Sequence, residues 1–428
     1  MAPITDENGW LRLVLECFRR EAGSEAPLPD SSLDLIETGA LDSMGWVSFL
    51  RALESASGVS DLGALLREQT PSLENTFLAL KNARSGSPSS GAGPSSKHQP
   101  LTQSSAIIAS SGAALGSRKI PSEEVDRAFG MPAGKLRLRA GIESLAYAAE
   151  DENELTLGAR AAQRALRAAA CGPQELDWII ATTETHRSYP SLAAQLHSQL
   201  LARETCGALD VGGACLGFVN ALAVAQGLIA SGHARTIAII TSDVHSRTFK
   251  PGRVAGEFGG LFGDGASAFL LRAKNGTRPR PAYGLGEFFF GCAGQYAGAI
   301  RVADAPNGNI DAHFDGEALS RAAITRLEKV VGDIELRSGI ARSSLQGLAT
   351  HQPNPRLVTL LAKQCGLPLE KFPVVARHFG NLGSSTCGVA LDAILESASS
   401  LPADKWGAIF TASLGPGLLF GGGWLVPA

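Results

Sequence analysis

The 428-residue sequence lacks the cysteine patterns of a cross-linked or zinc-binding fold, because no CxxC pair occurs and the cysteines are odd in number. They are Cys17, Cys171, Cys206, Cys215, Cys292, Cys365 and Cys387. Such usage is typical of reduced thiols in a cytoplasm and argues against a metal site. No apolar run is long enough to cross a membrane, and residues 1–30 lack the features of a signal peptide. We therefore expect a cytoplasmic protein with no metal and no membrane partner.

A strong charge of either sign is absent as well. The formal net charge is −3 and there is no basic run, so nucleic acid is not an expected partner. Hydrophobic residues make up 44% of the chain and charged residues 18%, which is typical of a globular protein. This length allows two or three domains.

One segment contains little besides serine, glycine and proline. From Arg84 the sequence reads "RSGSPSSGAGPSSKHQP", which buries too little apolar surface to order itself. We interpret residues 84–104 as a flexible linker. It separates a head, residues 1–83, from a body, residues 105–428.

The head has the pattern of a small all-α bundle. Apolar residues at helical spacing predict helices at Trp10–Arg20, Ser43–Gly58 and Ser72–Asn82. Ser43 stands at the start of the second helix, where serine is a common N-cap. From the residues alone, an N-cap and a modified serine both remain open.

The residues around Ser43 resemble the acyl carrier protein motif. The segment reads "IETGALDSMGWVSFLRALES", in which Gly39, Leu41, Asp42 and Ser43 fit the Gly-x-Leu-Asp-Ser pattern of that family. The resemblance covers residues 1–83 and implies a carrier domain with a 4′-phosphopantetheine arm on Ser43. It also implies a phosphopantetheinyl transferase as a partner.

The body contains an internal repeat. Segments "DWIIATTETHRSYPSLAAQLHSQL" and "LQGLATHQPNPRLVTLLAKQCG" both read as strand, polar loop, proline and helix, with Ala181 and Ala349 168 residues apart. Two later elements repeat in the same order at offsets of 171 and 170 residues. This predicts a duplicated α/β unit with halves at about 105–275 and 276–428. Continuous β-branched runs between helices predict largely parallel sheets that are covered on both faces.

The repeat brings three reactive or polar residues toward one another. Cys215 directly precedes an apolar helix, Asn381 lies in the equivalent loop of the second half, and His351 follows that half's first strand. A helix N-terminus lowers the pKa of a thiol, so Cys215 is a candidate nucleophile, with His351 and Asn381 as neutral donors to a second oxyanion. Taken singly, Cys215 also fits a core residue, His351 a strand-end residue and Asn381 a turn residue.

The same stretches resemble β-ketoacyl-acyl carrier protein synthase III of the thiolase superfamily. The motifs are "GGACLGFVNALAVAQGLIASG", "FGDGASAFLL", "THQPN" and "FGNLGSST", and the resemblance spans roughly residues 105–428. It implies a duplicated thiolase-type α/β fold with αβαβα layers, an acylated Cys215, and decarboxylation assisted by His351 and Asn381. It also implies a homodimer that takes acyl and malonyl-type thioesters on coenzyme A or carrier protein.

The C-terminal turn, "SLGPGLLFGGG", departs from this resemblance. In the family, a glycine N–H from this turn joins the cysteine N–H in the oxyanion hole, and Pro416 has no N–H to give. The Gly-Pro-Gly pattern resembles plant chalcone-synthase relatives. We therefore expect the backbone N–H groups of Cys215 and Gly417 to form the hole, with Gly415 as the alternative to Gly417.

The two resemblances together imply a condensing enzyme with a fused carrier. It would form a β-ketoacyl product by Cys215 acylation and decarboxylative Claisen condensation, in polyketide or specialised fatty-acid biosynthesis. The alternative is an acyltransferase that delivers the acyl group to an alcohol, an amine or another carrier. The His351–Asn381 pair favours condensation because enolate stabilisation needs both donors, whereas transfer needs only a base.

Overall fold

A computed structural model of the chain describes residues 7–23, 28–41, 43–59, 62, 66, 70–85, 105–274, 282–314 and 316–428. The chain folds into two compact units. One contains residues 1–99 and 315–322, and the other contains residues 100–314 and 323–428. Asp42 of the carrier motif lies outside the described residues. Residues 86–104, which form most of the predicted linker, also lie outside them.

The described part of the head contains helices that share one apolar core. They are α1 (Glu7–Ala22), α2 (Ser43–Ser57) and α4 (Leu73–Ser85). Phe49 of α2 packs against Phe18 and Trp46, with ring centroids 6.3 and 5.4 Å away. Ser43 is the first residue of α2, as the sequence predicts.

The described residues of the body contain a nine-stranded mixed sheet with the order β11-β12-β13-β8-β1-β7-β6-β4-β5. Its strands are β1 (Ala106–Leu115), β4 (Trp178–Thr182), β5 (Gly207–Asp210), β6 (Thr236–Val244), β7 (Asp264–Ala273), β8 (Tyr283–Cys292), β11 (Gly347–Thr350), β12 (Ile409–Gly415) and β13 (Leu419–Pro427). Only two residue pairs, Ile107 with Gly284 and Ile108 with Tyr283, join β1 to β8. The sheet therefore consists of two halves that meet at a short seam.

The predicted parallel character of the sheet is wrong for most strand pairs. Strands β4–β5, β4–β6 and β11–β12 are parallel, whereas all other neighbours in the described sheet are antiparallel. Parallel neighbours need a long crossover, but β12 returns to β13 through a turn of only a few residues. Buried apolar runs look alike in parallel and antiparallel strands that are covered on both faces.

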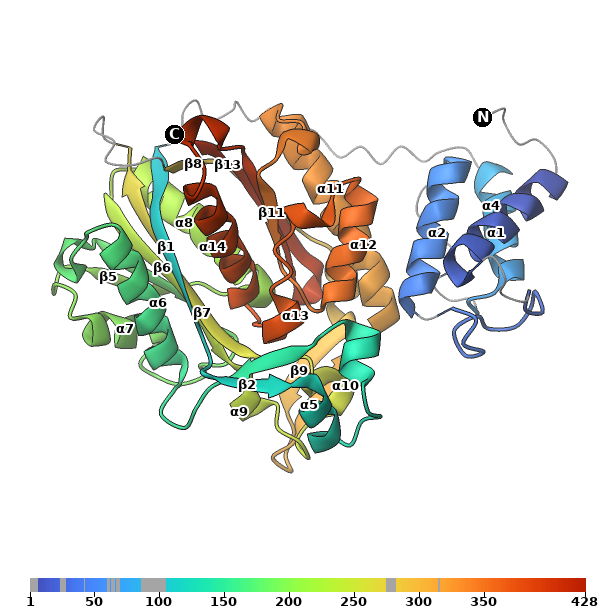
Figure 1. The fold of residues 1–428 in the computed structure, drawn as a ribbon, viewed down its shortest axis with the longest axis horizontal. Coiled ribbons are helices and arrows are strands. Elements are labelled where there is room, and N and C mark those ends of the chain that lie inside the picture. Colours follow the sequence, from blue (N-terminus) through green and yellow to red (C-terminus); the bar gives the residue numbers. More distant parts are fainter. Residues whose placement is uncertain are drawn as a thin grey trace. The chain divides into compact units, whose positions relative to one another are not determined.

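Helices cover both faces of each half, and two of them lie between the halves (Figure 1). From one side of the body to the other, the layers are α6 (Glu154–Ala168) with α7 (Leu192–Leu200), the first half of the sheet, α8 (Gly217–Ala230) with α14 (Ser385–Ser399), the second half, and α11 (Gly316–Ser338) with α12 (Pro355–Cys365). Helices α8 and α14 are apolar on most sides because both faces are buried. This is the α/β arrangement that the sequence predicts.

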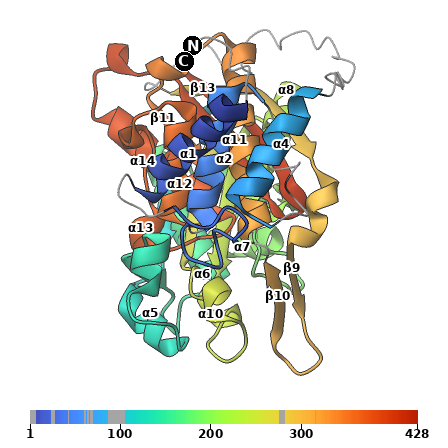
Figure 2. The same cartoon turned by 90° about the vertical axis from the view of Figure 1, so that its right-hand side faces the viewer.

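Shorter elements complete the body. They are β2 (Arg118–Pro121), α5 (Ser122–Ala128), β3 (Ser144–Tyr147), α9 (His245–Thr248), α10 (Gly256–Gly259), β9 (Ile300–Asp304), β10 (Ile310–Phe314) and α13 (Ala376–Phe379). Strands β9 and β10 form an antiparallel hairpin (Figure 2). Of the helices among the described residues, none is both long and apolar enough to cross a membrane.

Candidate active site

Cys215 lies on a sharp turn at the start of α8. The preceding residues have positive φ angles, 124° at Gly213 and 48° at Ala214. A side chain at Gly213 would collide with Asn220, so the turn requires glycine there. The Cys215 side chain is half-buried, and its carbonyl accepts a hydrogen bond of 2.7 Å from Ser413 Oγ on β12. The turn thus places the thiol at a helix start while the opposite half of the fold holds its backbone.

His351 directly follows β11 and is buried, with 7% of its surface exposed. The helix that follows, α12, is capped by Asn354, which accepts a 2.9 Å hydrogen bond from Leu357 N. The Nδ1 atom of His351 has no hydrogen-bond partner among the described residues. Burial lowers the pKa of His351 to about 4, so the imidazole is neutral at physiological pH.

Asn381 is held in place by backbone and side-chain bonds. Its N–H donates to Leu261 O at 2.8 Å, and its carbonyl accepts from Gly263 N at 2.9 Å. Its Oδ1 accepts from Gly383 N and Thr386 Oγ1 at 3.0 and 3.3 Å. No hydrogen bond between described residues uses Nδ2, so the amide keeps a donor for another molecule.

Contacts through shared neighbours connect the three predicted residues. The charge of Glu184 acts on both Cys215 and His351, and the Gly383 backbone contacts His351 while also donating to Asn381. The structure therefore links the three distant stretches of the chain through Glu184 and Gly383, and the catalytic roles of the three residues stay a prediction.

Comparison with known proteins shows the family to which the chain belongs. The 3-oxoacyl-[acyl-carrier-protein] synthase III family matches residues 209–288, and its C-terminal part matches residues 336–426. The β-ketoacyl-[acyl-carrier-protein] synthase III of Ruegeria sp. (strain TM1040) is 30% identical over 323 residues, 74% of this chain and 97% of that protein. The chain belongs to the β-ketoacyl-acyl carrier protein synthase III family. It is an acyltransferase of the synthase III type.

Further relatives of this synthase agree with the assignment. The synthase III 1 of Vibrio vulnificus (strain YJ016) is 33% identical over 261 residues, 59% of this chain and 79% of that protein. The solved synthase III of Pseudomonas aeruginosa PAO1 superposes with a TM-score of 0.67 at 25% identity, covering 75% of this chain and 98% of that one. OleA of Xanthomonas campestris with bound lauric acid and lauroyl-CoA has a TM-score of 0.68 at 20% identity over 76% of this chain and all of that one, which shows a shared fold.

The sequence analysis missed a buried cluster of charged residues beside the thiol. Glu184 Oε2 lies 3.4 Å from His245 Nε2, and Glu184 N donates to Asp243 Oδ1 at 2.5 Å. Asp243 Oδ2 also accepts from Ser384 Oγ at 2.6 Å. The repeat offers a signal for this cluster, because Glu184 occupies the loop after β4 that corresponds to the His351 loop after β11.

Burial and mutual attraction set the charges of this cluster. Burial raises the pKa of Glu184, but the hydrogen bond and charge of His245 outweigh it, so the net pKa is lowered. Burial lowers the pKa of His245, yet Glu184 and Asp243 raise it overall. Burial raises the pKa of Asp243 to about 6. Glu184 and His245 therefore each favour the charged form of the other.

The expected lowering of the Cys215 pKa is wrong for this structure. Burial, followed by the nearby carboxylate of Glu184, raises the pKa of the thiol well above 9.0. A helix N-terminus contributes only a partial positive charge, whereas Glu184 contributes a full negative one at close range. At neutral pH, Cys215 is therefore a thiol that must lose its proton as it attacks.

This raised pKa predicts the order of alkylation. We expect iodoacetamide to label the exposed Cys292 before Cys215 at neutral pH, and Cys215 labelling to increase with pH to beyond 9, because the thiolate is the reactive form. Peptide mapping over a pH series measures both rates, and Cys292→Ser provides the control. Early labelling of Cys215 at neutral pH would contradict the raised pKa.

The Gly-Pro-Gly turn lies against the nucleophile segment. A Cβ at Gly415 would come within 2.6 Å of the Gly213 carbonyl, so only glycine allows this approach. Gly417 has a φ of 79°, and its carbonyl accepts from Cys292 Sγ at 3.7 Å. The turn predicted to supply an oxyanion donor is thus adjacent to Cys215, and the choice of Gly417 remains a proposal.

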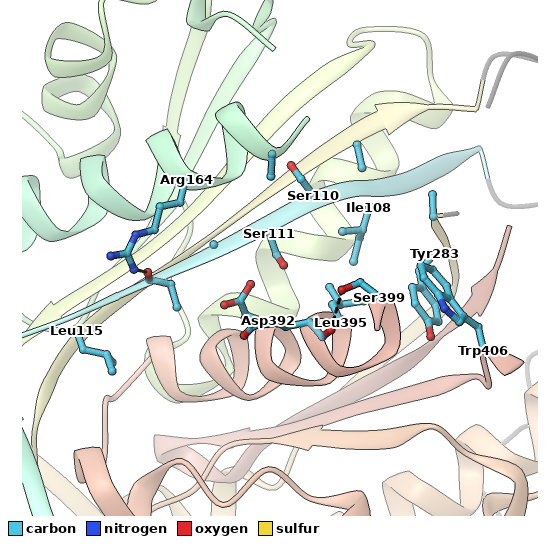
Figure 3. A pocket seen from close by; sticks show the side chains of 16 residues that line it. Ile108, Ser110, Ser111, Leu115, Arg164, Tyr283, Asp392, Leu395, Ser399 and Trp406 are labelled. Carbon is cyan, nitrogen blue, oxygen red and sulfur yellow. Dashed lines mark hydrogen bonds between the residues drawn. The ribbon is translucent and has the colours of Figure 1, made fainter. Parts of the chain in front are cut away.

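A separate groove runs along β1 between α6 and α14 (Figure 3). It has a volume of about 830 Å³ and holds Arg164, Asp392 and the stacked rings of Tyr283 and Trp406. None of the three predicted catalytic residues lines it. It therefore plays no part in the chemistry considered below.

Proposed function

We propose that this synthase joins an acyl group on Cys215 to a malonyl-type thioester carried on a pantetheine arm. The carbon–carboxylate bond of the malonyl unit breaks, carbon dioxide leaves, and the resulting enolate attacks the acyl carbon. The β-ketoacyl thioester forms, and the Cys215 sulfur departs and regains a proton. The observation that supports this proposal is that His351 and Asn381 share the neighbour Gly383 and keep polar atoms unused by the described residues, while Glu184 acts on both His351 and Cys215.

Both residues suit the stabilisation of an enolate. His351 is neutral because its pKa is lowered to about 4, so it offers an N–H without holding a charge near the malonyl carboxylate. Asn381 is oriented by donors to its Oδ1, which leaves its amide N–H groups for the enolate oxygen. Preorganised donors of this kind stabilise developing charge without reorganisation.

The experiment that tests this proposal measures carbon dioxide release and product mass together. The full chain is treated with a phosphopantetheinyl transferase and coenzyme A, and then with acyl and malonyl thioesters. Condensation predicts release of carbon dioxide and a β-ketoacyl product. An enzyme that acylates Cys215 but releases no carbon dioxide from any malonyl carrier, its own head included, would exclude condensation.

We further propose that the head is an acyl carrier protein domain with 4′-phosphopantetheine on Ser43. Ser43 begins the 15-residue helix α2, whose first turn contains no acidic residue. The partial positive charge of this helix start favours the phosphate of the arm. The fused carrier would keep its thioester at high effective concentration near the body and would serve polyketide or fatty-acid synthesis.

Ser43→Ala tests the carrier assignment. We expect a phosphopantetheinyl transferase with coenzyme A to add one phosphopantetheine mass to the native chain and none to the variant, because the hydroxyl is the attachment point. Intact-mass spectrometry measures the gain, and Ser48→Ala on the same helix, at a buried position, provides a matched control. A gain that persists in Ser43→Ala would place the arm elsewhere.

We also propose that two copies of the chain form a homodimer through the edge strand β5. Strand β5 is the last strand of the sheet, and Ala208, Leu209 and Asp210 on it are exposed. An edge strand with free backbone groups pairs readily with a second copy of itself.

Acyl transfer without carbon–carbon bond formation is the second candidate function. Glu184 favours it, because a buried carboxylate beside the nucleophile is the kind of base that activates an alcohol or amine. The carbon dioxide measurement separates the two functions.

A further inference from the structure

We infer that Glu184 is a catalytic residue that takes the thiol proton of Cys215 as the sulfur attacks the acyl donor, and that His245 positions its carboxylate. This inference rests on the proposed role of Cys215 as the acylated nucleophile. It concerns the acylation step, which precedes both condensation and simple transfer.

The two carboxylate oxygens of Glu184 have different surroundings. Oε2 faces His245 Nε2 at 3.4 Å, and the backbone of the loop is fixed by the bond from Glu184 N to Asp243. Oε1 is buried and has no hydrogen-bond partner among the described residues. The segment before Glu184 packs against the segment after Cys215, because a Cβ at Gly217 would collide with Thr182 Oγ1. In this arrangement the thiol and the carboxylate shift each other's pKa. One oxygen is thus anchored and the other is left to accept a proton.

His245 is itself fixed on both sides. Its Nδ1 lies 3.3 Å from the Gly263 carbonyl, and its ring packs against Phe249 and Phe262 with centroids 5.5 and 4.6 Å away. The ring is fully buried. Such packing keeps Nε2 directed at Glu184, which is the arrangement a positioning residue needs.

A base is required because the thiol is protonated at neutral pH, with its pKa raised by burial and by Glu184. When the proton moves to Glu184, the negative charge of the carboxylate is replaced by one on the attacking sulfur, so the total charge of the site does not change. Transfer to His351 would instead add a cation to a buried imidazole whose pKa burial lowers to about 4. Glu184 is the acceptor that costs the least charge separation.

The acylation step balances without any further reactant. The Cys215 sulfur bonds to the carbonyl carbon of the donor thioester as its proton moves to Glu184. The tetrahedral adduct then collapses, the carbon–sulfur bond of the donor breaks, and Glu184 passes the proton to the departing sulfur. The products are acyl-Cys215 and a free thiol, and Glu184 is again a carboxylate.

Glu184→Gln tests this role in the full chain. We expect the rate of Cys215 acylation by an acyl-coenzyme A donor to fall about a hundredfold, within the range of general-base catalysis. Alkylation of Cys215 by iodoacetamide should shift to lower pH in the same variant, because the carboxylate that raises the thiol pKa is gone. A merely structural role would not separate these two rates. Glu204→Gln, at an exposed position of the body, is the matched control.

The pH profile tests the role of His245. The titratable groups that face Glu184 are His245, Asp243, Cys215 and His351. Because His245 lowers the pKa of Glu184, His245→Gln should move the acidic limb of the acylation rate to higher pH. If the acidic limb of the pH profile is the same in His245→Gln as in native protein, then His245 does not position the base.

The remaining outcomes are equally distinct. If acylation of Glu184→Gln is unchanged, or rises together with alkylation, Glu184 is not the base and only suppresses the thiolate. A thermal melt of the Glu184→Gln variant that coincides with that of native protein shows that the variant is folded. Native protein that acylates Cys215 without releasing carbon dioxide would reject condensation but leave this inference standing.

Discussion

Asn381→Ala is expected to lower carbon dioxide release from a malonyl thioester a hundredfold or more, while acylation of Cys215 changes by less than about tenfold. Loss of one preorganised oxyanion donor costs about 3–4 kcal/mol, which is two to three decades of rate. We expect acylation to be spared because we propose that its oxyanion is held by the backbone N–H groups of Cys215 and of the Gly-Pro-Gly turn. Radiolabelled carbon dioxide and the mass of the acyl-enzyme report the two steps in parallel.

Asn381→Asp makes this comparison sharper. Aspartate keeps an oxygen for Gly383 N and Thr386 Oγ1, so the local anchor survives, but it removes the N–H donors. Decarboxylation should fall as far as in the alanine variant. His351→Ala should also lose decarboxylation. If Asn381→Asp decarboxylates at the native rate, then the amide acts through its oxygen, and the enolate is stabilised by other groups.

The sequence predicts this pair because the internal repeat has a nearly constant offset. Cys215 and the Asn381 loop both precede a buried helix, α8 and α14, in equivalent positions of the two halves. Equivalent loops meet when two halves pack on a shared pair of helices. The duplicated α/β unit could therefore be predicted from pattern and spacing, whereas the αβαβα layering is implied by the family resemblance.

The acidic partner of the thiol could not be predicted in the same way. Glu184 looks like an ordinary polar loop residue until its carboxylate is seen to be buried against His245 and near Cys215. Burial of a charge depends on packing from several segments, here β4, β6 and α9, and no local pattern records it. The prediction of mostly parallel strands was wrong for a related reason. Strands that are buried on both faces show no alternation of apolar and polar residues that would distinguish parallel from antiparallel neighbours.

The thiol pKa shows how far a local rule extends. A helix start favours a thiolate when the thiol is accessible and no anion is near. At Cys215 burial and Glu184 both act against the thiolate, and together they outweigh the helix. A raised thiol pKa also makes the Cys215 sulfur a poorer leaving group than a thiol of ordinary pKa.

Cys215→Ala should abolish acylation of the enzyme while carbon dioxide release stays within about tenfold of native, because in the proposed mechanism decarboxylation uses His351 and Asn381 and not the sulfur. The malonyl unit would lose carbon dioxide, and the enolate, with no acyl group to attack, would take a proton and become an acetyl thioester. Intact-mass analysis of the carrier therefore distinguishes this variant from native protein, which yields a β-ketoacyl thioester. The backbone turn at Ala214–Leu216 is retained by alanine, and the bond from Ser413 to the residue 215 carbonyl needs no side chain there. If carbon dioxide release falls as steeply as acylation, then the enolate forms only when an acyl group is already on Cys215, and the two half-reactions are not separable.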